Sequence, residues 1–157
     1  SLCAVLLLAA AARPPLVTAA QPTGTHAPNP WLGKWKMNIA KSTYSGPAPK
    51  GATHWFVETK DGMTQIIEQE TSDGRKLRTE VTAKLDGKDY PVAGDAQRDS
   101  TRAFRRIDRR TLEVTNKTDG KVTSTIREVI SPDGKTRTAT ATGRNATTAN
   151  VLVFERQ

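Results

Sequence analysis

Cysteine and histidine are almost absent from this sequence. The 157 residues contain one cysteine, Cys3, and two histidines, His26 and His54. A lone cysteine forms no internal disulfide, and a zinc site needs three or four ligands, so neither is expected. The sequence also lacks a nucleophile elbow, a phosphate-binding loop and a dinucleotide fingerprint. It therefore predicts no metal, no cofactor and no catalytic residue.

Large aromatic side chains are scarce too. Aromatic residues make up 5% of the chain and apolar residues 36%, so Thr, Val, Ala and Ile must build most of the core. β-Branched residues suit the pleated surface of a sheet. The net charge is +8, which attracts anionic partners but by itself indicates solubility rather than a specific site.

The N-terminal segment differs from the rest. Residues 2–12 read LCAVLLLAAAA, an apolar run of eleven residues that is shorter than the roughly 20 needed to span a bilayer. Such a run is typical of a secretory signal. We predict a signal peptide over 1–20, truncated at its start, a flexible Pro-rich leader over 21–30 and one domain over 31–157. The protein would then be exported to a bacterial periplasm or the extracellular space.

Turn signals recur along the rest of the chain, and the segments between them alternate polar and apolar residues. Asp-Gly pairs favour tight β-hairpins, and they stand at 61–62, 73–74, 86–87, 119–120 and 133–134. We predict about nine or ten strands, near 32–39, 53–60, 63–71, 76–85, 88–92, 101–107, 111–118, 121–130, 135–143 and 149–156. A meander of this length closes readily, because closure removes exposed edges. The predicted fold is all-β, a single antiparallel up-and-down barrel, with the Pro-rich segment 41–51 crossing one end.

Short motifs at both ends of the domain resemble a known architecture. The first strand contains GKWKMN, and the chain closes on VLVFERQ. Gly33-Lys34-Trp35 resembles the Gly-x-Trp of the calycins, the group of lipocalins and intracellular fatty-acid-binding proteins. The phrases DGKDYPVAG and SPDGKTRTATATG resemble small exported bacterial proteins with no assigned activity.

The resemblance carries implications for the site. Gly33 and Trp35 would form a structural plug at the closed end, covered by an arginine of a late strand, either Arg156 or Arg137; alternatively, Trp35 would line a ligand cavity. Two features depart from the fatty-acid binders. The Pro-rich loop cannot supply their two lid helices, and Leu152 and Phe154 stand where they carry an Arg-x-Tyr pair.

Four residues are candidates for ligand contact: Tyr44, Trp55, Phe104 and Arg106. Tyr44 lies on the Pro-rich loop and would rim a mouth. Adjacent strand residues point to opposite faces, so only one of Trp55 and Phe56 faces the interior, and we assign Trp55 to the ligand. Ordinary core packing or loop anchoring would explain the same residues.

The segment 98–110, RDSTRAFRRIDRR, contains six arginines. Arg102, Phe104 and Arg106 share one face of its strand, while Ala103, Arg105 and Ile107 share the other. At least one arginine is therefore expected to point inward, where it would need a partner or mark an anionic ligand. A solvated strand and turn is the alternative.

Three functions fit these features. The first is a non-enzymatic, exported, lipocalin-like binding protein for a small apolar or amphipathic ligand. The second is a surface module in which the 98–110 segment binds anionic glycan or lipid. The third is an enzyme with a site inside the barrel, which would require a cluster of titratable groups. A monomer is expected, and nucleic acid is not an expected partner.

Overall fold

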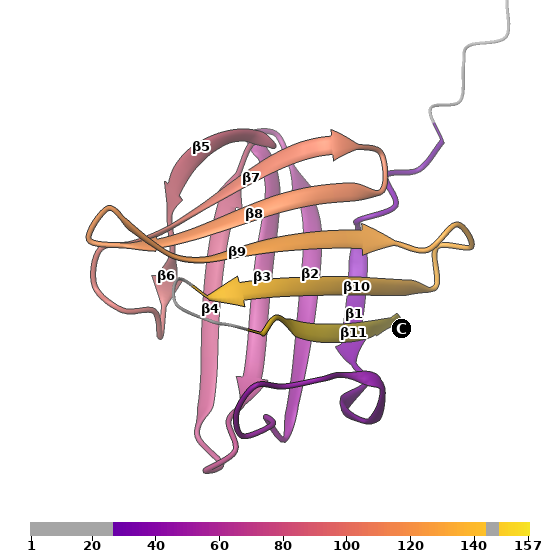
Figure 1. Ribbon diagram of the computed structural model, residues 1–157. Coiled ribbons are helices and arrows are strands. Elements are labelled where there is room, and N and C mark those ends of the chain that lie inside the picture. The colour runs from indigo at the N-terminus through magenta and orange to yellow at the C-terminus, as the bar shows by residue number, and fades with distance from the viewer. Residues whose placement is uncertain (1–26, 144–147) are drawn as a thin grey trace, which may run out of the picture.

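The computed structural model describes residues 27–143 and 148–157 (Figure 1). The predicted signal peptide and the first part of the predicted leader lie outside this range. The described chain is all-β, as predicted, and none of its helices is long and apolar enough to cross a membrane. It has one 3-10 helix, η1 (Ile39–Lys41), and eleven strands: β1 (Gly33–Met37), β2 (Gly51–Thr59), β3 (Gly62–Glu70), β4 (Lys76–Ala83), β5 (Asp86–Pro91), β6 (Ala93–Gly94), β7 (Ser100–Asp108), β8 (Thr111–Thr118), β9 (Lys121–Ile130), β10 (Thr136–Gly143) and β11 (Asn150–Arg156).

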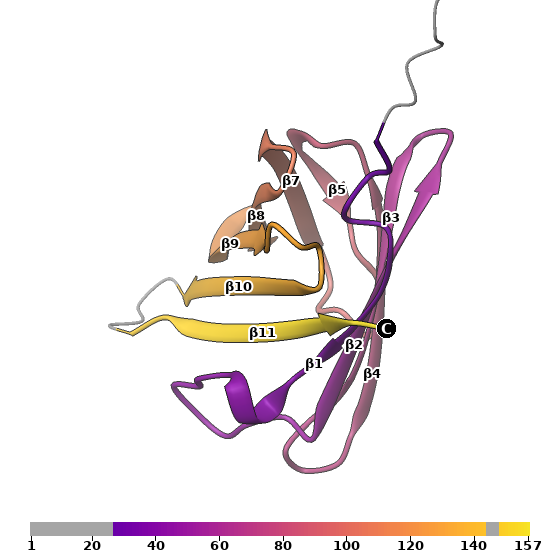
Figure 2. The same cartoon turned by 90° about the vertical axis from the view of Figure 1, so that its right-hand side faces the viewer.

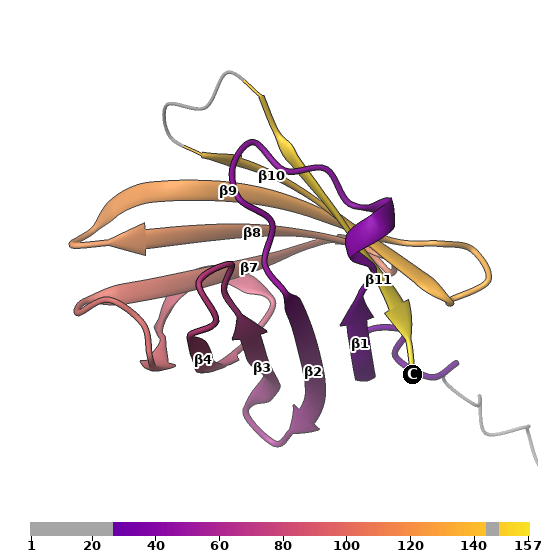
Figure 3. The same cartoon turned by 90° about the horizontal axis from the view of Figure 1, so that it is seen from below.

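The strands form one antiparallel sheet that curls into a nearly closed barrel. Their order is β5-β7-β8-β9-β10-β11-β1-β2-β3-β4-β6. The first and last strands of the chain pair with each other, with Trp35 opposite Arg156. Figures 2 and 3 show β1–β4 as one wall of the barrel and β7–β11 as the wall facing it. The predicted up-and-down barrel is confirmed, and its architecture is compatible with a calycin-like fold.

The segment after β4 departs from the predicted meander. Asp86 and Gly87 do not form a two-residue turn, because among this pair only Gly87 has a positive φ. They begin β5 instead, and β5 pairs with β7 rather than with β4. The two-residue strand β6, which falls between the predicted strands 88–92 and 101–107, pairs with β4. β5 and β6 are therefore the two edge strands of the sheet. They do not pair with each other, so the barrel is not closed by hydrogen bonds at this point.

The turn at 119–120 does take the predicted form. Asp119 and Gly120 have φ values of 50° and 71°, as a type I′ hairpin turn requires at both central positions. This turn joins β8 to β9.

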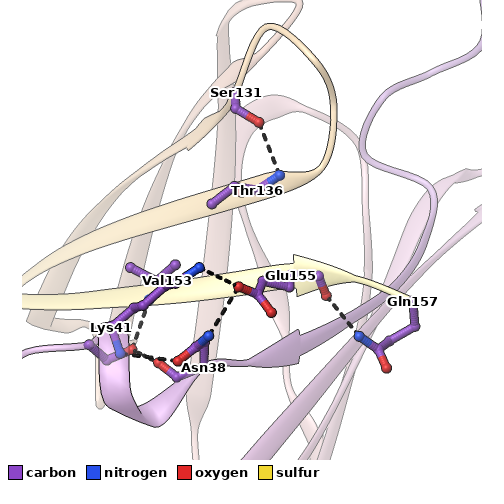
Figure 4. A network of polar contacts seen from close by, with 8 residues as sticks. Asn38, Lys41, Ser131, Thr136, Val153, Glu155 and Gln157 are labelled. Carbon is purple, nitrogen blue, oxygen red and sulfur yellow. Dashed lines mark hydrogen bonds and ion pairs between the residues drawn. The ribbon is translucent and has the colours of Figure 1, made fainter.

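The segment after β1 is fixed to the last strand. Lys41 Nζ and Asn38 Nδ2 donate hydrogen bonds to Glu155 Oε1 on β11, at 2.8 and 3.0 Å (Figure 4). Ser42 Oγ accepts a hydrogen bond of 3.0 Å from the backbone N–H of Val153. These contacts place the Pro-rich segment that follows beside the start of β11.

The core fills the barrel unevenly. Its largest fully buried side chains include two tryptophans, three phenylalanines and one arginine. In order of volume they are Trp31, Trp35, Arg137, Phe56, Phe104 and Phe154.

Candidate functional site

One end of the barrel, which we call the closed end, is sealed by Trp31, Trp35 and Arg156. Trp35 is fully buried, and its indole N–H donates to the carbonyl of Trp31 at 3.0 Å. The Arg156 guanidinium lies 4.2 Å from the Trp35 ring centroid, within cation–π range. It also donates to the carbonyls of Leu32 and Gly134, at 2.7 and 2.9 Å. Arg137 lies farther from the same ring, at 5.7 Å.

Gly33 has a physical reason to precede this tryptophan. Its φ is +109°, a conformation that L side chains rarely adopt. A Cβ at this position would also lie 3.2 Å from Arg156 Nη1. The Gly-x-Trp spacing therefore leaves room for the arginine that covers the tryptophan.

Residues 27–30, the last part of the predicted leader, lie against the closed end. Arg109 Nη2 donates to the carbonyl of Pro28 at 2.9 Å, and the Trp31 indole donates to the carbonyl of Arg109 at 3.1 Å. The backbone N–H of Trp31 is capped by Asn29 Oδ1 at 3.2 Å. This segment adds to the closure.

The opposite end, which we call the open end, is packed less completely. The inward row of side chains can be followed across the sheet from Trp35 to His54, Ile67 and Thr79, which stand opposite one another on β1–β4. Along β3, β4 and β9 this inner face changes from buried near the closed end to partly exposed near the open end, whereas Met37 on β1 and Ala52 on β2 remain buried. The change runs from Met63 and Gln65 to Ile67 and Gln69 on β3, from Ala83 and Val81 to Thr79 and Leu77 on β4, and from Ile130 and Glu128 to Ile126 and Ser124 on β9.

A buried ion pair lies between the two halves. Arg137 Nη1 on β10 and Glu128 Oε2 on β9 are 2.8 Å apart, with side chains 0% and 4% exposed. Arg137 Nη2 lies 2.8 Å from His54 Nδ1 on β2, and its guanidinium carbon lies 4.1 Å from the Phe154 ring centroid. Arg137 Nε is the one buried side-chain nitrogen or oxygen without a hydrogen-bond partner among the described residues. The pair is enclosed by aromatic rings and fixed by β2, β9 and β10 together.

A second arginine lies on the open side of this pair. Arg102 on β7 donates to Gln65 Oε1 through Nη1 at 2.5 Å and to Asn116 Oδ1 through Nε at 2.7 Å. Asn116 in turn donates to Ser124 Oγ at 2.9 Å. Burial lowers the pKa of Arg102, an effect that the negative charge of Glu128 partly opposes. We call His54, Gln65, Arg102, Asn116 and Ser124 the polar floor.

His54 is a neutral hydrogen-bond donor toward the interior. Burial holds its pKa well below the usual value near 6.5, and the positive charges of Arg137 and Arg102 lower it further. Because Arg137 donates to Nδ1, the single ring proton of the neutral imidazole is on Nε2. Neither ring nitrogen is then free to accept a proton, and Glu128 is held by Arg137. Arg137 therefore engages both His54 and Glu128 in hydrogen bonds.

Two pockets open at this end. One, of about 300 Å³, is lined by Thr79, Val92, Gln97, Arg102, Asn116 and Ser124, among others. The other, of about 540 Å³, lies at the rim of β1–β4; Met37, Ala52, Gln69 and Leu77 line it together with charged residues such as Lys50 and Asp95. The smaller pocket thus leads from solvent to the polar floor. Among the described residues, no group of three or more His, Cys, Asp or Glu side chains could hold a metal ion.

The four predicted ligand residues lie in different places. Tyr44 packs against the core beside the open end, where its hydroxyl lies 3.3 Å from Met37 Sδ. Phe104 is 1% exposed and belongs to the core. Arg106 is exposed at the closed end, in a pocket of about 320 Å³ shared with Glu58. The structure therefore does not bring these residues together.

The assignment of Trp55 to the interior needs correction. Its neighbour Phe56 points inward, is 1% exposed and meets Trp31 edge to face, with ring centroids 6.1 Å apart. Trp55 lies on the outer face, with Lys34 Nζ 5.0 Å from its ring centroid. The register decides the face, because His54 stands opposite the inward Trp35 and Trp55 stands opposite Lys34.

The arginines of the 98–110 segment do not share one face. Arg102 points inward, and Arg105 pairs on the outside with Glu113 at 2.8 Å. Arg106 and Arg109 line pockets at the closed end with Glu58. The expectation that at least one arginine points inward is met by Arg102.

Most residues of the polar floor were not predicted from the sequence as part of a site. Alternation placed Arg102 on the same face as Phe104, and this is the one signal that pointed to it. His54 was considered only as a metal ligand, and Arg137 only as a cover for Trp35. Comparison with protein-family models, with curated proteins and with solved structures finds no match.

Proposed function

We propose that this protein is an exported, lipocalin-like binding protein that holds a small amphipathic molecule in the open half of its barrel. The observation that carries the proposal is the change of the inner face from buried to partly exposed along β3, β4 and β9. Small ligand-binding barrels keep one such site inside the strands. Export rests on the apolar run at 2–12.

The lining suits an amphipathic molecule. Ile67, Ile126 and Leu152 supply partly exposed apolar surface, and the polar floor supplies donors. Binding sites of this kind are mostly apolar with a few placed polar groups. The proposal is non-enzymatic because His54 and Glu128 are both engaged by Arg137.

Two measurements test the carrier. Native mass spectrometry of the protein isolated from its own cells should show a retained small molecule. In addition, the neutral probe N-phenyl-1-naphthylamine should bind the emptied protein with one-to-one stoichiometry and increased fluorescence.

A matched pair of variants locates the probe. Ile126→Trp fills the inner face, while Arg127→Trp places the same side chain on the exposed outer face of the same strand. We expect the first to abolish probe binding and the second to preserve it. Equal binding by both variants, or no binding by the wild type, would refute a site inside the barrel.

A further inference from the structure

The interior of the barrel contains more positive than negative charge. Arg137 is fully buried, Arg102 is half-buried and lines the 300 Å³ pocket, and Glu128 is the acid whose charge acts on Arg102. Glu128 is hydrogen-bonded to Arg137, whereas the hydrogen-bond partners of Arg102 among the described residues, Gln65 and Asn116, are neutral. A buried charge is costly unless an opposite charge accompanies it. One positive charge is therefore left without a counterion from the described chain.

Arg102 also has donor capacity to spare. A guanidinium presents five N–H groups, and its Nη1 and Nε are used by Gln65 and Asn116. Its Nη2 makes no hydrogen bond with any described residue. This nitrogen is nevertheless not one of the buried side-chain atoms that lack a hydrogen-bond partner among the described residues. Since Arg102 lines the 300 Å³ pocket, this nitrogen reaches accessible space there.

His54 also carries an N–H donor. Arg137 fixes its proton on Nε2, and this nitrogen likewise makes no hydrogen bond within the described part of the chain. It is not among the buried unpartnered atoms of the described residues, but neither pocket at the open end is lined by His54. Arg102 therefore supplies both a donor that reaches the smaller pocket and a positive charge.

We infer that the ligand carries an anionic head group, held by Arg102 in the 300 Å³ pocket, with its apolar part against Val92 at that pocket and the partly exposed apolar side chains of the inner face. This inference rests on the proposed function and names the ligand class. Carboxylate, phosphate and sulfate share the required chemistry, because each accepts charge-assisted hydrogen bonds from a guanidinium. Arg105, on the outer face of the same strand, already has Glu113 as its counterion at 2.8 Å.

The experiment compares ligands that differ only in the head group. Isothermal titration at fixed ionic strength measures decanoate, 1-decanol and decylammonium on the wild type, on Arg102→Met and on Arg105→Met. Arg105 is the matched control, because it is the same residue type on the same strand but lies outside, paired with Glu113. Loss of a charge-assisted contact corresponds to about tenfold or more in affinity.

We expect the wild type to bind decanoate about tenfold more tightly than decanol, and to bind decylammonium least. Arg102→Met should weaken decanoate at least tenfold and leave decanol within about twofold, while Arg105→Met changes neither. The ligand-free Arg102→Met protein loses the donor to the buried Gln65 Oε1 and should melt slightly lower than the wild type. Binding is therefore measured well below both Tm values, and a loss of decanol affinity in parallel with decanoate affinity would indicate a structural role for Arg102 instead.

Decyl phosphate and decyl sulfate distinguish the head groups, and the tightest of the three anions identifies the class. Equal affinity for decanol and decanoate would overturn the anionic head group while leaving the carrier intact. Failure of every decyl ligand and of the neutral probe would overturn the carrier itself. Binding of acetate or inorganic phosphate as tightly as the decyl ligands would overturn the apolar part.

Discussion

The Arg137–Glu128 pair offers the sharpest test of the interior. Replacing Glu128 with glutamine keeps the shape and removes the negative charge, so that Arg137 is left buried without its ion-pair partner. Breaking a fully buried pair in this way costs about 3–5 kcal/mol. The total stability of a domain is about 5–15 kcal/mol, so we expect Glu128→Gln to remove a large part of it. The 0% and 4% exposure of the two side chains places them in this class rather than among surface pairs.

Urea unfolding measures the effect, with the emission of the buried Trp31 and Trp35 as the signal. For a slope of about 2 kcal/mol per molar urea, the expected loss shifts the midpoint by about 2 M. The control is the double variant Glu128→Leu with Arg137→Met, which removes both charges. It should cost only about 1–3 kcal/mol, chiefly because His54 Nδ1 loses its donor. A cost below about 1 kcal/mol for Glu128→Gln, or a double variant as unstable as the sum of the two single variants, would refute this reasoning.

The same substitution separates stability from binding. Without Glu128 the interior holds two arginines and no acid, so it attracts an anion more strongly than the wild type does. We therefore expect Glu128→Gln to bind decanoate more tightly even though it unfolds more easily. If stability and affinity for decanoate both fell, the charge argument for the site would be wrong.

Three further predictions follow from other parts of the structure. The depressed pKa of His54 means that the unfolded chain binds a proton at a higher pH than the folded protein, so the free energy of unfolding falls as the pH drops below about 6.5, by up to about 1.4 kcal/mol per pH unit. Urea unfolding from pH 7.5 to 5 should show this pH dependence in the wild type and not in His54→Gln. The same pH dependence in both proteins would argue against it. Arg156→Ala should cost about 2–4 kcal/mol in thermal unfolding, because Trp35 loses its cation and the carbonyls of Pro30, Leu32 and Gly134 lose their donor. An unchanged Tm would count against this role. Gly94→Ala should cost more than about 2 kcal/mol, since φ is +92° and the new Cβ would lie 2.2 Å from the carbonyl oxygen of Arg78. Gly51→Ala is the control and should be tolerated, because a Cβ at that position has no atom within 4 Å. Similar Tm values for the two alanine variants would contradict the strain at Gly94.

The local residue pattern predicts most strands well, but it does not predict how β5 and β6 pair at the two edges of the sheet. Alternation and Asp-Gly turns depend on neighbouring residues, so β2 to β4 and β7 to β11 fall within a few residues of their predicted ranges. The two-residue β6 is too short to produce a pattern. The Asp86-Gly87 pair looks like a hairpin turn, but the path of the chain after β4 depends on which strand has an open edge.

The inner face of β2 shows why the site could not be predicted completely. One set of alternating residues is Ala52, His54 and Phe56, and the other includes Trp55 and Val57. Both sets contain apolar residues, so composition does not choose between them. The choice comes from pairing with β1, and the contact between His54 and Arg137 joins residues 83 positions apart. Such a contact depends on register across the closed barrel, which no local pattern contains.

The scarcity of aromatic residues has a consequence for function. Five of the eight aromatic residues are among the largest fully buried side chains, and they pack the closed end and the centre of the barrel. The inner face toward the open end is then left to Thr, Ser, Asn, Ala and a few aliphatic residues, whose volume does not fill it. Because Trp31, Trp35 and Arg156 seal one end, the other can stay incompletely packed without unfolding the sheet. A lean composition therefore leaves the inner face toward the open end partly exposed, and under the proposed function the charge of Arg102 would determine which ligands bind there.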